Sequence, residues 1–132
     1  MPTNITFAKV QSYLDAIADN PDNNPIDASP HGRFWSGKTR DEFVASNIPN
    51  VTCHGAPIPA IDQSNLPDSA NESPFFLILT NTDGFCQKRQ MPGGGPFITD
   101  PNYQVTLADG TIVTGEQIQT DLKEWLSNGF PE

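Results

Sequence analysis

Apolar residues recur at helical spacing near both ends of the chain. The first repeat consists of Phe7, Val10, Leu14 and Ile17, and the last of Ile118, Leu122, Trp125 and Leu126. Steps of three and four positions place such residues on one face of a helix. The spacing therefore predicts a helix over residues 6–20, which the following Asn- and Pro-rich segment ends, and a second helix at the C-terminus. Thr114 and Gln117 form a capping box for the second helix, and Gly129 suits its C-terminal end.

Two shorter helices are predicted between them. Thr39 and Glu42 form a capping box before a turn that would bury Phe43 and Val44. The apolar run over residues 75–80 permits either a buried strand or a short buried helix. Ser73 followed by Pro74 places a good N-cap residue before a proline at the first helical position. This pair favours the helix.

The remaining regions carry turn residues. Residues 103–107 and 111–114 alternate between apolar and polar types on either side of Ala108, Asp109 and Gly110, which predicts a β-hairpin. Residues 49–67 are rich in proline and predict an extended segment without regular structure. The expectation is a mainly α fold of three to five helices, a single domain over residues 1–132, with one hairpin before the last helix.

Composition and charge narrow the classes of partner. Thirteen prolines and ten glycines favour long ordered loops. A net charge of -9 argues against nucleic acid and anionic membranes, and it suits a protein partner with a basic surface. No basic-then-apolar leader opens the chain, and no apolar run reaches membrane-spanning length. The chain as written is expected in the cytoplasm, or in the periplasm or outside the cell if a leader was removed. The oligomeric state is left open.

The sequence contains two cysteines, Cys53 and Cys86. Two cysteines are too few to define a disulfide framework. If they were bonded to each other, the closed loop of about 30 residues would stabilise the fold by roughly 3–4 kcal/mol. A possible disulfide and two separate cysteines both remain open.

The order of these elements resembles that of small c-type cytochromes. The residues that carry the resemblance are the first amphipathic helix, the helix opened by Ser73 and Pro74, the segment from Met91 to Pro96, and the final helix with Trp125. The resemblance covers most of the chain, although each motif is short, and it implies a cytochrome c-like fold. The haem-attachment motif Cys-x-x-Cys-His is missing: Asp27 and Pro30 stand where the two cysteines belong, and His31 remains.

The resemblance implies His31 and Met91 as the two haem ligands, if haem is bound without covalent attachment. An imidazole and a thioether are an established axial pair for haem iron. Alternatively, His31 lies in an ordinary loop and Met91 fills a gap in the core. The latter interpretation is favoured.

Two further metal hypotheses involve the cysteines. Cys53 and His54 could attach haem through a single thioether bond, although no long helix precedes them. Cys53, His54, Cys86 and Met91 supply the soft sulfur and imidazole donors that copper prefers. Neither hypothesis has the expected surroundings in the sequence.

No catalytic constellation stands out, so an enzyme is not expected. The leading hypothesis is a haem-free module that acts as an accessory or protein-interaction subunit and binds no cofactor. Its contact surface would be the Met91 loop and the hairpin. The alternative is an electron-transfer protein with non-covalent haem held by His31 and Met91.

Overall fold

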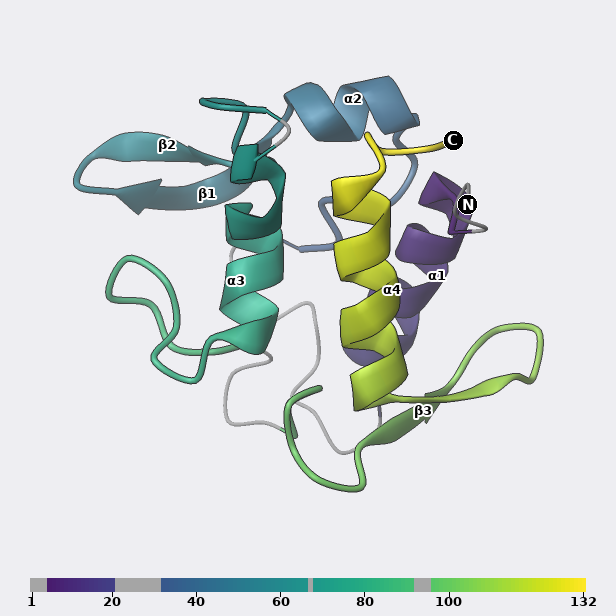
Figure 1. Cartoon of the computed structure of the whole chain (residues 1–132). Helices are drawn as coiled ribbons and strands as arrows, with labels where there is room; N and C mark the ends of the chain where they lie inside the picture. Colours follow the sequence, from purple (N-terminus) through teal and green to yellow (C-terminus); the bar gives the residue numbers. More distant parts are fainter. Residues whose placement is uncertain (1–4, 21–31, 67, 92–95) are drawn as a thin grey trace.

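The computed structural model describes residues 5–20, 32–66, 68–91 and 96–132. In chain order, the helices and strands are α1 (Phe7–Ala18), α2 (Arg40–Ala45), β1 (Asn47–Cys53), β2 (Ala56–Pro59), the 3-10 helix η2 (Asp68–Glu72), α3 (Pro74–Thr80), β3 (Gln104–Thr106), β4 (Ile112–Thr114) and α4 (Gly115–Ser127) (Figure 1). The predictions of a helix near each end, of the helix after Ser73, and of the helix after Thr39 are confirmed.

The two terminal helices pack against each other and carry the centre of the core. Both apolar stripes predicted from the sequence are buried. Trp125 on α4 is fully buried, and its ring lies 6.0 Å from that of Phe7 on α1 and 6.2 Å from that of Phe43 on α2. Phe75 on α3 contacts Phe43 edge to face at 5.4 Å. This aromatic cluster joins all four α-helices, and each such pair contributes about 0.5–1.5 kcal/mol beyond area burial.

A polar contact crosses the same helix interface. The hydroxyl of Tyr13 on α1 donates to the buried carboxylate of Asp121 on α4, and the Gln117 amide donates to the other oxygen at 2.7 Å. Burial, followed by the hydrogen bond to Asp121 and its negative charge, raises the pKa of Tyr13. The tyrosine therefore stays a donor, and the buried carboxylate has partners for both of its oxygens.

The expectation of a mainly α, cytochrome c-like fold is wrong. Alongside the helices, the structure contains two separate antiparallel two-stranded sheets, β1–β2 and β3–β4. The second is the hairpin predicted from the sequence, and its register pairs Val105 with Val113. The first lies within the segment for which no regular structure was predicted. The fold is a mixture of helices and small sheets.

The β1–β2 hairpin forms despite its prolines because they lie where a strand tolerates them. Pro49, Pro57 and Pro59 are exposed, and a two-stranded ladder leaves one edge of each strand unpaired. The register shifts between Asn47 and Thr52, where Asn50 has a φ of 62°. Such an irregularity absorbs extra residues in one strand. The sequence pattern was obscured because this bulge interrupts the alternation.

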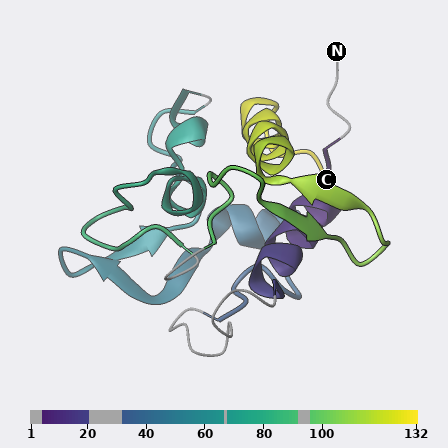
Figure 2. The same cartoon turned by 90° about the horizontal axis from the view of Figure 1, so that it is seen from below.

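The two hairpins lie on opposite sides of the helices. In Figure 1 the β1–β2 hairpin and the loop that follows α3 are on one side, and β3 is on the other. The same separation is visible from below in Figure 2. Across the described residues, no helix is both long enough and apolar enough to span a membrane.

Candidate functional site

An apolar pocket of about 340 Å³ lies on the side of the β1–β2 hairpin. Ile48 and Val51 from β1 and Ile58 from β2 form one wall. Pro74 and Ile78 from α3 form another. The pocket is partly open to solvent, and its volume lies at the lower end of the roughly 300–1,000 Å³ that is typical of small-ligand sites.

The loop after α3 and one side chain from before α2 complete the lining. Phe85, Lys88, Arg89 and Met91 come from the loop, and Phe34 comes from the segment before α2. The backbone N–H of Met91 donates to the carbonyl of Ile78 at 2.8 Å, which holds the end of the loop against α3. The pocket is therefore built from segments that are up to 57 positions apart, Phe34 and Met91 being the extremes.

Gln90 holds the loop from inside the protein. Its side chain is buried, and its amide donates to the carbonyl of Leu79 at 2.9 Å and to the hydroxyl of Thr99 at 2.8 Å. A buried amide nitrogen that donates two hydrogen bonds restrains the backbone that carries it. The neighbouring Arg89 and Met91 are positioned by this anchor.

The tip of the loop is a tight two-residue turn. Phe85 and Lys88 exchange both backbone hydrogen bonds at 2.9 Å, and Cys86 and Gln87 between them have φ values of 49° and 67°. Gly84, with a φ of 78°, precedes this turn, and a Cβ atom there would lie 1.7 Å from the carbonyl oxygen of Lys88. Only glycine allows so close a backbone approach. Gly84 thus determines where Lys88 can lie.

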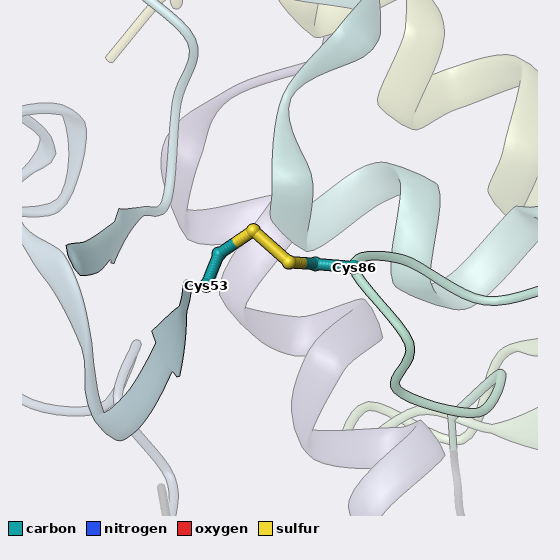
Figure 3. Close-up of a disulfide and its surroundings, with 2 residues drawn as sticks. All are labelled: Cys53 and Cys86. Atoms are coloured by element: carbon teal, nitrogen blue, oxygen red, sulfur yellow. A yellow bond between two sulfur atoms is a disulfide. The ribbon is translucent and has the colours of Figure 1, made fainter. Parts of the chain in front are cut away.

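A disulfide between Cys53 and Cys86 links the β1–β2 hairpin to the loop after α3. Figure 3 shows the bond running from the end of β1 to the loop after α3. The two Cα atoms are 5.8 Å apart, within the ordinary range for disulfides. Each cysteine lies in or next to a tight turn. Cys86 is part of the turn at the tip of the loop, and Cys53 precedes a turn in which His54 and Gly55 have φ values of 51° and 82°. The cross-link limits how far the β1–β2 hairpin and the loop can separate.

His54 and the two cysteines are close enough to suggest a metal centre. The Sγ atoms of Cys53 and Cys86 and a ring nitrogen of exposed His54 all lie within 4.8 Å of one another. Metal ions bind cysteine as the thiolate, and both sulfurs are used by the disulfide. In this oxidised state neither cysteine can supply the thiolate that the copper hypothesis, or haem attachment at Cys53, requires.

The two residues proposed as haem ligands have different outcomes. His31 lies outside the described residues, so its position relative to Met91 stays untested. Met91 is half-buried and lines the apolar pocket. The pairing of His31 with Met91 remains a prediction.

The charge at the pocket differs from that of the protein as a whole. Of the described residues that line it, Lys88 and Arg89 are charged and none is acidic. No described carboxylate forms an ion pair with either of them, whereas Arg33 pairs with Asp15 and Asp19, and Arg40 pairs with Asp41. No sequence motif singles out Lys88 or Arg89. They are the only two adjacent basic residues in a chain of net charge -9, which was the available signal.

The described lining of the pocket is mainly apolar. Its described lining offers no hydroxyl, thiol, imidazole or carboxylate that could act as a nucleophile or general base. It supplies apolar surface, one thioether and two cations. Such a lining suits a ligand with an apolar part that can be buried inside the pocket.

Comparisons with known proteins add no relative. The chain matches no protein-family model, no curated protein and no solved structure. The resemblance to c-type cytochromes therefore stays an expectation from sequence motifs.

Proposed function

We propose that this protein is a non-catalytic accessory module that recognises a ligand or partner by taking one of its apolar groups into the pocket. The observation that carries the proposal is the pocket itself, whose apolar walls remain partly open to solvent. Burying an apolar group there contributes about 25 cal/mol for each Å² of apolar surface removed from contact with water.

The construction of the pocket supports a binding role. One wall belongs to a helix whose buried residues join the aromatic core, and the opposite walls are cross-linked by the disulfide. A site that is held open before binding loses little conformational freedom when it is occupied. A rigid recognition surface is therefore present on this side of the protein.

The pocket also shifts the expected contact surface. The sequence suggested both the Met91 loop and the β3–β4 hairpin. Met91 lies at the pocket, but β3–β4 is on the opposite side of the helices (Figures 1 and 2). The hairpin exposes one large apolar residue, Ile112, which is 64% exposed. A single exposed isoleucine is ordinary for a protein surface, so the pocket is the stronger candidate.

The test fills the pocket with a larger side chain. In Ile78→Trp the indole should occupy the cavity, and affinity for the neutral fluorescent probe N-phenylnaphthylamine should fall at least tenfold. The matched control is Leu66→Trp, because Leu66 is 43% exposed and is not part of the pocket lining. Probe fluorescence gives the affinity, and circular dichroism verifies that both variants fold. Unchanged binding in Ile78→Trp would contradict the proposal, as would a wild-type protein that takes up no probe.

A second function, electron transfer with non-covalent haem, is favoured by one observation. Met91 places a thioether at an apolar pocket, and a thioether opposite an imidazole raises the potential of haem iron. Titration with hemin is the test. A Soret band that is lost in both Met91→Ala and His31→Ala would support the carrier. Protein that takes up no hemin would exclude it.

A further inference from the structure

We infer that the pocket binds a small amphipathic anion, an aliphatic carboxylate whose chain lies between β1–β2 and α3 and whose head group meets Lys88 and Arg89. This inference rests on the proposed function and adds the chemical class of the ligand.

The charge at the pocket selects an anion. Lys88 is half-buried and Arg89 is exposed, both line the pocket, and no described carboxylate forms an ion pair with them. The other described arginines each contact an aspartate. A guanidinium binds a carboxylate through two parallel hydrogen bonds, and an ammonium adds a point charge. In a protein of net charge -9, this is a local site of opposite sign.

The rest of the lining selects an apolar body. Aliphatic side chains from β1, β2 and α3 and the ring of Phe85 form walls that offer no charged partner of their own. A simple inorganic anion would leave those walls in contact with water. A volume of about 340 Å³ admits one alkyl chain or small ring system, which favours a small molecule over an extended macromolecular surface.

The loop holds in place the backbone that carries the two cations. The close approach of Gly84 to the Lys88 carbonyl, the buried anchor at Gln90 and the disulfide at Cys86 hold the backbone on both sides of the two residues. A backbone that is already held in place loses less conformational freedom when its side chains bind an anion. Recognition of the head group therefore follows from the same loop that closes the pocket.

The experiment compares ligands of equal chain length and different head group. Decanoate, decanol and decyltrimethylammonium would each be titrated against bound N-phenylnaphthylamine. We expect decanoate to displace the probe at least tenfold more tightly than decanol, because its carboxylate forms charge-assisted hydrogen bonds with Lys88 and Arg89; tenfold corresponds to about 1.4 kcal/mol. Shortening decanoate to octanoate should weaken binding by about fourfold per methylene. Added salt should weaken the binding of decanoate and leave that of decanol unchanged.

Charge-removing variants assign the head-group site. The variant Lys88→Gln/Arg89→Gln should lose the preference for decanoate and keep its affinity for decanol. The matched control is Lys38→Gln/Lys123→Gln, which removes the same charge from residues outside the pocket lining and should keep the preference. Decyl sulfate in place of decanoate shows whether the site distinguishes a carboxylate from another anionic head.

The outcomes separate the inference from the proposed function. If wild-type protein binds decanol as tightly as decanoate, or binds decyltrimethylammonium best, the inference is overturned. The proposed function, binding of an apolar group in the pocket, would still stand. The inference is also overturned if the control pair abolishes the preference as fully as the Lys88 and Arg89 pair. If no alkyl ligand and no neutral probe binds, both proposals fail. Displacement of the probe only by a protein or peptide, with all the small ligands inert, also overturns the inference.

Discussion

At the scale of single residues, the least expected feature is a buried ionisable pair in an apolar core. Helical periodicity indicated which positions of α1 and α4 face inward, but it gave no sign that Tyr13 and Asp121 face each other, 108 positions apart. Asp121 is 7% exposed, and its carboxylate accepts hydrogen bonds from the Tyr13 hydroxyl and the Gln117 amide. A buried charge of this kind is tolerated only while its hydrogen bonds are made.

Removing the tyrosine hydroxyl should therefore destabilise the fold. In Tyr13→Phe one oxygen of the buried carboxylate loses its donor, and the free energy of unfolding should fall by about 1–3 kcal/mol. Urea unfolding measures the change. The matched control is Tyr103→Phe, which removes the same atom from the other tyrosine, whose hydroxyl donates to no buried carboxylate in the described part of the chain.

A double-mutant cycle checks the physical cause. In an Asp121→Asn background, Tyr13→Phe should cost less, because a neutral amide loses less than a carboxylate when its donor is removed. Equal costs in the two backgrounds would show that packing rather than the hydrogen bond explains the effect. A stable Tyr13→Phe variant would rule out the assigned role of the pair.

At the scale of elements, the start of α2 has the clearest local signal in the sequence. The Thr39 side chain accepts from the N–H of Glu42 at 3.2 Å, and the Glu42 carboxylate accepts from the N–H of Thr39 at 2.9 Å, so the predicted capping box is present. The hydrogen bond from the Thr39 backbone, followed by that from its side chain, lowers the pKa of Glu42. The β1–β2 hairpin was missed because its only signals are a turn at His54 and Gly55 and an interrupted alternation.

The capping box predicts a dependence of stability on pH. A lowered pKa in the folded state means that the stabilisation is complete above the unfolded pKa of about 4.3 and is lost as the pH falls through the lower folded value. At pH 6 the melting temperature of the wild-type protein should therefore be higher than that of the Glu42→Gln variant. This difference in melting temperature should shrink as the pH approaches 3. Thermal unfolding followed by circular dichroism measures both.

The control for this series is Glu72→Gln, a glutamate at the end of η2 that lies outside any capping box. Its difference from the wild-type protein should stay small over the same range. A Glu42→Gln difference that is constant with pH would contradict the assignment.

At the scale of the whole molecule, the disulfide links the pocket to stability. It joins residues 33 positions apart and spans two walls of the pocket. In Cys53→Ser/Cys86→Ser the unfolded chain regains the freedom of that loop, and unfolding should require about 3–4 kcal/mol less. The same change should weaken the binding of N-phenylnaphthylamine, since the hairpin and the loop are no longer held at a fixed spacing.

Urea unfolding with and without dithiothreitol measures the first effect. The double variant itself is the control, because a reductant should lower the stability of the wild-type protein and leave the variant unchanged. A wild-type protein whose stability and probe affinity are both insensitive to the reductant would contradict the role given to the disulfide.

Elements with local signals could be predicted from the amino-acid sequence. Periodicity, caps and turn chemistry each involve residues only a few positions apart. These signals predicted helices α1 and α4, the capping box of α2, the start of α3 at Pro74 and the β3–β4 hairpin.

The remaining features became apparent only in the folded protein. Four features depend on residues that packing brings together. They are the β1–β2 pairing, the partner of Cys53, the Tyr13–Asp121 bond and the placement of Lys88 and Arg89 beside apolar walls. No local pattern encodes such distances, because a contact between distant residues depends on how every intervening element packs. For this reason the candidate site, unlike the helices, became visible only in the folded chain.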